Sequence, residues 1–369
     1  PVGSCLSGGL DSSSIVCIAN QLLHEQNAHG LQKTFSACAE EAKYDERKWI
    51  DIVVNATDVD AHYVYPLLSG LFEESANITW HQDEPFGSTS IYAQWKVFGL
   101  ANEQRIKVML DGQGADEQLA GYHGFFGPHL GTLLRAGRIA TMLKETSAMK
   151  KLHGYSFARS AVYLAKVILP EWLKDLLRKL TGRTAAQSAW LNCQRLNCKA
   201  INPFIAGGAA GAQSIQTLSI AQLTASNLQM LLHWEDRDSM AHSIESRVPF
   251  LDYRLVEFIL GLPDEYKLSE GITKRVLRQG MSGILPNEIC DRMDKKGFET
   301  PEETWLRDTS PDLFRIKLGD AINVSQGVLH REESLIVLEE MITGKRPFSF
   351  LPWRMISFGE WVKSFGVAV

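Results

Sequence analysis

The sequence lacks the features that mark several classes of protein. Its six cysteines are widely spaced among 369 residues without a Cys-x-x-Cys pair, which argues against a zinc site and a disulfide framework. No apolar run approaches the ~18 residues of a membrane span, and no secretory signal opens the chain. Acidic residues outnumber basic ones, 43 to 38, which disfavours a general nucleic-acid binder. We therefore expect a cytoplasmic protein without membrane or nucleic-acid partners.

An alternation of strand and helix patterns fills the first 125 residues. Apolar runs predict strands at 2–6, 34–39, 61–65 and 107–110, and helical spacing predicts helices over 12–23, 45–56 and 91–103. Strands separated by helices predict an α/β fold whose parallel sheet is flanked by helices on both faces. Ligands of such sheets bind beyond the carboxyl ends of the strands. Two segments rich in Gly and Asp follow strands in this way, at 7–12 and 111–121.

The composition changes after residue 128, and we predict three segments. Residues 1–128 form the α/β core, 129–215 form a helical insert, and 216–369 form a mostly helical part that completes the site. The insert is basic, with 11 Lys/Arg against 3 acids between 131 and 190. A solvated helical face is the favoured interpretation of this charge, and a lid or docking surface is the alternative. Nucleic-acid binding is disfavoured, because no basic platform with interleaved aromatic side chains accompanies the charge.

The segment 7–12, SGGLDS, joins the first predicted strand to the first helix. Its glycines let backbone N–H groups face an anion, and the N-terminus of the helix adds its dipole. The hydroxyls of Ser7 and Ser12 can donate to phosphate oxygens, and Asp11 can hold a Mg²⁺ ion that bridges phosphates. No Gly-Lys-Ser/Thr follows, so this is not a Walker A loop. The alternative is an ordinary turn between strand and helix.

Four motifs in order resemble the synthetase domain of class B, glutamine-dependent asparagine synthetases. These enzymes belong to the ATP pyrophosphatase group, which cleaves ATP between the α and β phosphates. The motifs are SGGLDS at 7–12, LDGQGADE at 110–117, DRDSMA through ESRVPFLD at 236–252, and KRVLR, LP and KKGF between 274 and 298. The resemblance covers the chain from position 2 to about 306, and it implies an adenine nucleotide alpha-hydrolase-like fold for the α/β core.

The resemblance also implies roles for individual residues. Asp11 and Asp116 would hold Mg²⁺, and Lys274 would stabilise charge on an acyl-adenylate. The residues expected to bind ATP or its pyrophosphate are Leu6, Ser7, Gly8, Gly9, Asp11, Ser12, Phe35, Ser36, Gly112 and Gly114. This chemistry is reasonable, because a carboxylate must be activated before it can be amidated near pH 7. Metal and lysine charges would offset the phosphate charge that develops.

The second loop departs from the family at its middle position. Well-studied asparagine synthetases carry a glutamate there, which is credited with helping to deprotonate ammonia. This chain carries Gln113, which cannot act as a base, and Asp111 stands where those enzymes have serine. We predict Lys274, Asp116, Gln113 and Asp111 as the catalytic residues, with Asp111 partly replacing the glutamate. The change leaves open an amidotransferase or a lactam-forming cyclase that acts on a peptide or sugar acid.

The third motif supplies candidate substrate-binding residues. Asp236, Arg237, Glu245 and Arg247 could form an ion-pair network facing the substrate, because arginine suits recognition of a carboxylate. The alternative is a structural cluster of salt bridges that orients the C-terminal helices. His242 could shuttle a proton, although a structural histidine is the favoured interpretation.

We predict an ATP-dependent amide-forming ligase that uses L-aspartate and ammonia as substrates and ATP with Mg²⁺ as cofactors. The resemblance implies a glutaminase domain upstream, whose first residue is a nucleophilic cysteine. Cys5 lies within a predicted strand and does not fit that part, and the chain starts at Pro1 on a strand, so we expect a longer native protein. The oligomeric state stays open, with a homodimer among the options. A nucleotide-binding module without ligase activity is the alternative from another class.

Overall fold

The computed structural model describes residues 2–28, 32–170, 172–174, 176, 189–197, 212–294 and 299–368. The strands in this part of the chain are β1 (Val2–Cys5), β2 (Gln32–Ala37), β3 (Asp60–Val64), β4 (Val108–Leu110), β5 (Glu245–Arg247), β6 (Leu268–Ser269) and β7 (Ile272–Thr273). Between β1 and β5 lie α1 (Leu10–Glu25), α2 (Arg47–Ala56), α3 (Leu68–Gln82), α4 (Ser90–Glu103), α5 (Ala115–Gln118), η1 (His123–Phe125), α6 (Phe126–Arg135), α7 (Ile139–His153), α8 (Phe157–Ile168), α11 (Ile215–Thr224) and α12 (Asn227–Ala241).

The helices after β5 complete the fold. They are η3 (Pro249–Leu251), α13 (Tyr253–Gly261), α14 (Asp264–Lys267), α15 (Arg275–Gly280), α16 (Asn287–Asp291), α17 (Glu302–Thr304), η4 (Trp305–Thr309), α18 (Pro311–Val324), α19 (Arg331–Ile342) and α20 (Leu351–Phe365). Local capping defines some of these ends. The Asp252 carboxylate accepts a hydrogen bond from the backbone N–H of Arg254 at the start of α13, which satisfies one of the donors that a helix N-terminus leaves open.

Five strands form one parallel sheet in the order β3-β2-β1-β4-β5. In the central strand β1, Ser4 pairs with Thr34 of β2 on one side and with Leu110 of β4 on the other. The strand order reverses at β1, so the loops that follow β1 and β4 leave the sheet side by side. This confirms the predicted parallel sheet. The sequence pattern missed β5, because Glu245 and Arg247 are charged and its three residues do not form an apolar run.

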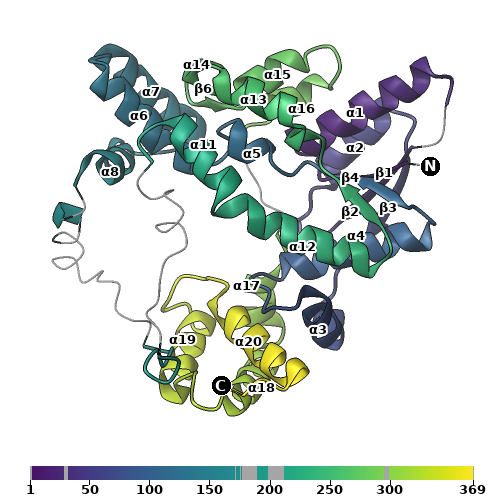
Figure 1. Ribbon diagram of the computed structural model, residues 1–369, viewed down its shortest axis with the longest axis vertical. Helices are drawn as coiled ribbons and strands as arrows, with labels where there is room; N and C mark the ends of the chain where they lie inside the picture. The colour runs from purple at the N-terminus through teal and green to yellow at the C-terminus, as the bar shows by residue number, and fades with distance from the viewer. Residues whose placement is uncertain are drawn as a thin grey trace.

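Helices cover both faces of the sheet, with α1 and α2 on one face and α4 and α12 on the other (Figure 1). Under α1 and α2 the core contains Val16, Ile50 and Val53. On the opposite face Phe98 and Met109 belong to a second core. Each fully buried side chain of this size contributes roughly 1.5–3 kcal/mol. This packing fixes the sheet, and with it the two loops.

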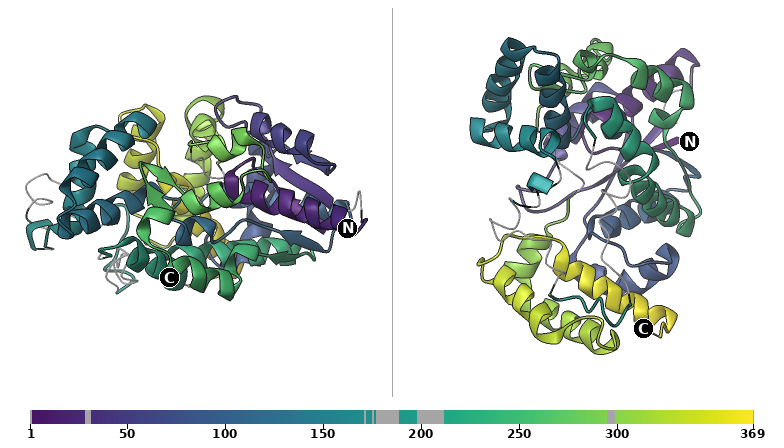
Figure 2. Two further views of the ribbon diagram at one scale, coloured as in Figure 1. Left: turned by 90° about the horizontal axis from the view of Figure 1, so that it is seen from above. Right: turned by 60° about the vertical axis from the view of Figure 1, so that its left-hand side comes forward.

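The remaining helices gather at two places away from the sheet. Helices α6, α7 and α8 lie near one end of the molecule and α18, α19 and α20 at the other (Figures 1 and 2). Phe126 and Met149 share a core with Ile215, and Leu71 of α3 shares another with Trp353 of α20. These cores join residues from both sides of the predicted boundaries, and the three-segment division stays a prediction.

Some predicted features lie outside the described residues. These are the KKGF segment at 295–298 and the part of the basic insert that falls in the gaps given above. Within the described ranges, no helix is both long enough and apolar enough to cross a bilayer.

Candidate active site

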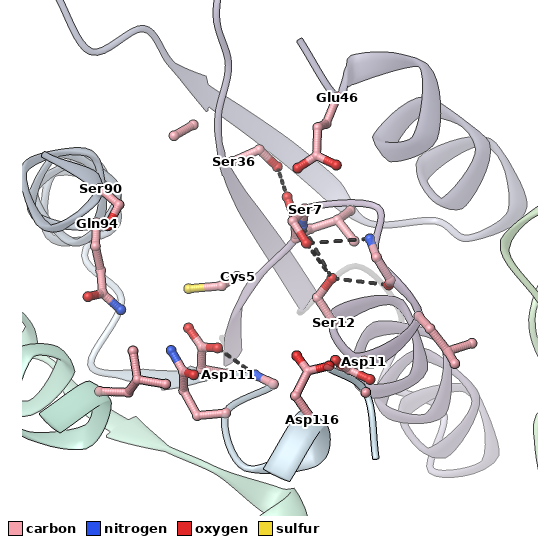
Figure 3. A pocket seen from close by; sticks show the side chains of 18 of the residues that line it. Cys5, Ser7, Asp11, Ser12, Ser36, Glu46, Ser90, Gln94, Asp111 and Asp116 are labelled. Atoms are coloured by element: carbon pink, nitrogen blue, oxygen red, sulfur yellow. Dashed lines mark hydrogen bonds between the residues drawn. The ribbon is translucent and has the colours of Figure 1, made fainter. Parts of the chain in front are cut away.

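A cavity of about 270 Å³ opens where the loops after β1 and β4 meet. Its wall combines both loops with residues from β2, α4, α12 and α15, and from the segments that precede α15 and follow α16 (Figure 3). The structure brings most of the predicted site residues into this wall, namely Leu6, Ser7, Gly9, Asp11, Ser12, Phe35, Ser36, Asp111, Gly112, Gln113, Asp116 and Lys274. Loops separated by about 100 positions in the sequence therefore form one site.

The loop after β1 is organised by its own hydroxyl groups. Ser7 Oγ lies 3.1 Å from Ser12 Oγ, and Ser12 Oγ donates to the carbonyl oxygen of Gly9 at 3.3 Å. Gly8 adopts a φ of +68°, and a Cβ atom there would lie 2.5 Å from the Cβ of Trp49, so only glycine fits. The helix α1 begins at Leu10, and its N-terminus faces the loop. This arrangement favours an anion at the cavity.

Lys274 connects the two loops. Its Nζ lies 2.5 Å from Asp11 Oδ2 and 2.7 Å from Asp116 Oδ1, and its side chain is only 6% exposed. Burial alone would lower the pKa of Lys274, but the two carboxylates outweigh burial and raise it. The ammonium group is therefore charged. A Cβ atom at Gly121 would overlap Asp116 and Lys274, so glycine leaves room for the cluster.

The carboxylates of Asp11 and Asp116 lie next to one another at the meeting point of the loops (Figure 3). Mg²⁺ is commonly bound by one or two carboxylates, with water and substrate phosphates as the other ligands. The pair fits that donor set. Within the described residues, no group of three or more His, Cys, Asp or Glu side chains could hold a metal by itself. A magnesium ion at this site would therefore depend on phosphate oxygens.

Asp111 belongs to the loop after β4 and lies beside Cys5 of β1, close enough to Asp11 for the charge of that carboxylate to raise its pKa. Its Oδ1 accepts a hydrogen bond from Gly112 N at 2.5 Å. Burial raises the pKa of Asp111, although hydrogen bonds from Cys5 and Gly112 oppose the rise. Burial and the nearby Asp111 carboxyl also raise the pKa of the Cys5 thiol. Cys5 is therefore protonated and a poor nucleophile.

The wall also contains residues that the sequence did not single out. Arg292 donates to the carbonyl oxygen of Gly8 at 3.0 Å and pairs with Glu46 at 2.6 Å and Asp294 at 2.9 Å. It therefore ties the loop after β1 to the segment after α16. Arg278 also lines the cavity and donates to backbone carbonyls at 2.5–2.9 Å. The KRVLR motif contained a signal for Arg278, whereas nothing local marked Arg292 or Glu46.

The predicted substrate-binding residues lie elsewhere. Arg247 pairs with Glu245 at 2.8 Å on the edge strand β5, and both side chains are about 60% exposed. Arg237 pairs with Asp83 at 3.0 Å, and Asp236 stands beside it on α12. The structure thus forms two separate pairs instead of one network, and none of the four predicted residues belongs to the cavity wall.

The other predicted positions shape the surroundings of the cavity. Gly114 adopts a φ of +88° at the start of α5, where a Cβ atom would overlap Leu251. The ring of His242 packs at 4.3 Å from that of Trp95. Burial lowers the pKa of His242, so this histidine is neutral and belongs to the packing between α4 and the end of α12.

The sequence of this chain is similar to a known protein family and to several curated proteins. A family model described as asparagine synthase matches residues 1–363. Glutamine-hydrolysing asparagine synthetase 1 of Bacillus subtilis strain 168 is 27% identical over 98% of this chain and 56% of its own length. Asparagine synthetase 3 of the same organism is 25% identical over 98% of this chain and 54% of its own length. Amidase chry2 of Gibberella zeae is 21% identical over 83% of this chain and 50% of its own length. The chain spans about half the length of the curated relatives it matches.

Proposed function

This chain belongs to the asparagine synthase family, and we propose that it is an ATP-dependent ligase that forms an amide bond. In this proposal it activates the side-chain carboxylate of L-aspartate as an acyl-adenylate, releases pyrophosphate, and transfers ammonia to give asparagine. The observation that carries the proposal is the position of Lys274, held between Asp11 and Asp116 where the two glycine loops meet.

The loop after β1 would bind the pyrophosphate portion of ATP. Its backbone N–H groups and the N-terminus of α1 favour an anion, and the hydroxyls of Ser7 and Ser12 lie 3.1 Å apart at the cavity wall. Leu6 and Phe35 supply apolar surface beside them, which suits an adenine ring. Ser36 donates to the carbonyl oxygen of Leu6 at 2.6 Å and so holds β2 against this part of the wall.

Lys274 would offset negative charge as the carboxylate attacks the α-phosphate. A cation fixed in a buried site needs little reorganisation, so it stabilises developing charge better than water does. Asp11 and Asp116 would hold Mg²⁺, which neutralises phosphate charge when it is bound. The two carboxylates also keep Lys274 charged. Bond formation between carboxylate oxygen and phosphorus would displace pyrophosphate from ATP.

Gln113 and Asp111 would face the nucleophile in the second step. A nitrogen lone pair forms a bond to the acyl carbon, the acyl C–O bond to AMP breaks, and a proton leaves the nitrogen. Asp111 lines the cavity, and its raised pKa makes it a stronger proton acceptor than a free aspartate. Gln113 can orient the nucleophile but cannot take its proton.

The source of ammonia would lie in another part of the protein. The Bacillus subtilis relatives are named as glutamine-hydrolysing, and they are nearly twice as long as the matched region. We infer a glutaminase domain upstream of these residues, and we infer that residues 1–369 use free ammonia when that domain is missing. The buried, protonated Cys5 does not fit a glutamine-hydrolysing nucleophile. A cytoplasmic location belongs to the same proposal.

Product analysis by mass spectrometry tests the proposal. The protein is incubated with Mg-ATP, L-aspartate and ammonium chloride, and AMP, pyrophosphate and asparagine are quantified. Equal amounts of the three products are expected. Formation of AMP and pyrophosphate without asparagine would contradict the assignment of ammonia as nucleophile. Formation of ADP and phosphate would contradict the pyrophosphate-loop assignment.

Gln113 favours a second candidate function with the same activation chemistry. A neutral amide in place of a carboxylate suits a nucleophile other than free ammonia, or an acceptor larger than aspartate, such as a peptide or sugar acid. Replacing Gln113 with Glu distinguishes the candidates. A rise in aspartate-dependent turnover supports asparagine formation, whereas no rise together with a clear preference for another acid supports the second candidate.

A further inference from the structure

A tight turn lies just before Lys274 in the sequence. Strands β6 and β7 pair as an antiparallel hairpin, and Glu270 and Gly271 are the two residues between them. Lys274 follows β7 directly. Its backbone N–H donates to the carbonyl oxygen of Leu119, at the end of α5, at 3.2 Å. The hairpin therefore helps to set where the backbone of Lys274 lies.

The backbone of this segment has a conformation that its residues disfavour. The φ angle is +55° at Glu270, +73° at Gly271 and +54° at Lys274. Positive φ at both turn residues is the geometry of a type I′ turn, which favours Asn-Gly over Glu-Gly, and residues other than glycine seldom adopt it. A hairpin of two strands is also at best marginally stable alone. Neighbouring elements must therefore hold the turn in place.

Helix α7, which lies beside β6 in Figure 1, holds the turn through Glu145. The Glu145 side chain is buried, its Oε1 accepts the backbone N–H of Glu270 at 2.8 Å, and its Oε2 accepts that of Gly271 at 2.9 Å. His153 Nε2 lies 2.8 Å from the carbonyl oxygen of Gly271. A Cβ atom at Gly271 would lie 3.2 Å from the carbonyl carbon of Ala148. The turn is thus packed directly against the backbone of α7.

The Glu145 side chain is charged although it is buried. Burial alone would raise the pKa of Glu145, but His129, whose Nε2 lies 3.7 Å from Oε1, and the two N–H groups of the turn outweigh burial and lower it. A carboxylate offers an acceptor at each oxygen, whereas a glutamine offers one acceptor and one donor. Hydrogen bonds to a charged acceptor are also the stronger kind. Glutamate therefore fits the two N–H groups of this turn better than its amide does.

We propose that Glu145 is a positioning residue for Lys274 and acts through this turn. It fixes the turn on α7, and β7 joins the fixed turn directly to Lys274. The ammonium group of Lys274 is thereby held between Asp11 and Asp116. This inference rests on the proposed adenylation step, and it gives the predicted helical insert, which contains α7, a part in that step.

The test separates the rate of adenylation from the binding of ATP. ATP–pyrophosphate exchange with aspartate is measured over a range of ATP concentrations for Glu145→Gln, which places an NH₂ group against one N–H of the turn. We expect kcat for exchange to fall roughly 10–100-fold, the size that misplacement of a reacting group produces. The KM for ATP should change less than about twofold, because Lys274 acts on charge that develops only during the reaction.

A substitution in the turn adds a readout that a general loss of stability would not change. Since Asn-Gly forms a type I′ turn well unaided, Glu270→Asn should return exchange by Glu145→Gln to within about threefold of the unmodified protein. The Glu270 side chain is exposed, so this change acts on the turn itself. The matched control for Glu145→Gln is Asp264→Asn, which changes a carboxyl to an amide at the start of α14, just before the hairpin. It should keep both kcat and KM.

The outcomes distinguish this inference from the proposed function. If the unmodified protein shows no exchange with aspartate, the proposed function fails and the inference falls with it. If exchange is normal and Glu145→Gln exchanges at the unmodified rate, only the inference is overturned. A loss that Glu270→Asn does not restore, or a rise in the KM for ATP as large as the fall in kcat, would also overturn it, because either would show a general structural role.

A second pair of variants decides the question should Glu145→Gln fail to fold. Gly271 and Gly344 share a φ of +73°, but within 4 Å of an added Cβ atom only Gly271 has a neighbour, the backbone of α7. Gly271→Ala should therefore lower kcat for exchange as Glu145→Gln would, and Gly344→Ala should not. Equal exchange by these two variants would overturn the inference.

Discussion

Around Lys274, two carboxylates converge on one ammonium group, whereas around Asp111 the neighbours are the thiol of Cys5 and the carboxyl of Glu235. The first cluster stabilises charge, because the cation keeps its own proton between carboxylates. In the second cluster, burial raises the pKa of each member, so each group binds a proton more readily than it would in water. The same pair of loops thus provides one side suited to phosphate charge and another suited to proton transfer from an amine.

Replacing Lys274 removes the cation of the first cluster and should have the largest effect on stability and activity. Lys274→Ala leaves Asp11 and Asp116 close together without their shared partner, and breaking a buried ion pair costs about 3–5 kcal/mol. We expect a matching fall in the free energy of unfolding, measured in urea without nucleotide. We also expect ATP–pyrophosphate exchange to fall by roughly 1,000-fold, since a preorganised charge is lost. Exchange within tenfold of the unmodified protein would remove Lys274 from the charge-stabilising role.

Changing one carboxylate of that cluster should have the next largest effect. Asp11→Asn keeps the side-chain shape but loses the charge that would hold Mg²⁺, so we expect exchange to fall roughly 100-fold. The matched control is Asp58→Asn, at a half-exposed position where Asn20 and His24 contact the carboxylate. The control should behave like the unmodified protein. Unchanged exchange in Asp11→Asn would favour a nucleotide-binding module in which this loop does not serve catalysis.

Glu302 is a buried carboxyl outside both clusters, and its titration should make the free energy of unfolding depend on pH. Glu302 accepts a hydrogen bond from Thr89 Oγ1 at 2.7 Å, and burial raises its pKa to about 7. Because the unfolded glutamate titrates near ~4.3, the folded state binds more protons between pH ~4 and 7. Stability should therefore fall by about 3 kcal/mol as the pH rises through this window. Urea unfolding at pH 5 and pH 8 measures this fall.

Glu302→Gln removes this titrating group, so its free energy of unfolding should decrease less between the two pH values than that of the unmodified protein. Glu302→Gln is compared at each pH with Glu265→Gln, a change at an exposed glutamate. Glu265→Gln should keep the original pH dependence. Parallel curves for all three proteins would show that Glu302 titrates at its ordinary value.

The smallest effect is expected for Arg247, a predicted substrate-binding residue that lies outside the cavity wall. Arg247→Ala breaks an exposed pair with Glu245, and such surface pairs contribute at most about 1 kcal/mol. We expect the KM for the acid substrate to change less than about twofold. Arg254→Ala, which breaks a similar exposed pair with Asp252, is the matched control. A tenfold rise in KM confined to Arg247→Ala would restore the substrate-binding interpretation.

The sequence could predict the loops because their chemistry is local. Residues 7–12 follow a strand directly and contain their own glycines and hydroxyls, and residues 111–117, which follow β4, contain their own glycines and carboxyl groups. The alternation of strands and helices predicts that the strands are parallel, whereas the pairing of β1 with β4, which brings both loops together, is seen only in the structure. The fold class and the place of each loop at the end of a strand therefore follow from local patterns of residues.

The other features of the site depend on packing between segments that are distant in the sequence. Arg292 and Glu46 reach the cavity wall only because the segment after α16 folds back over the first loop. Glu235 stands beside a recognised motif, yet nothing in its neighbourhood identifies Ser246 of β5 as its hydrogen-bond partner. Conversely, Glu245 and Arg247 belong to a specific motif but lie on an edge strand, exposed. A motif identifies the family of a segment and not the direction in which each side chain points.

The most direct test of the account follows oxygen from the acid to the nucleotide. Aspartate labelled with oxygen-18 in its side-chain carboxylate is incubated with Mg-ATP, ammonium chloride and the protein, and the nucleotide products are analysed by mass spectrometry. If the carboxylate attacks the α-phosphate, AMP carries one labelled oxygen and pyrophosphate carries none. Unlabelled AMP, or label in inorganic phosphate with ADP as the other product, would contradict adenylation and with it the roles assigned to Lys274, Asp11 and Asp116.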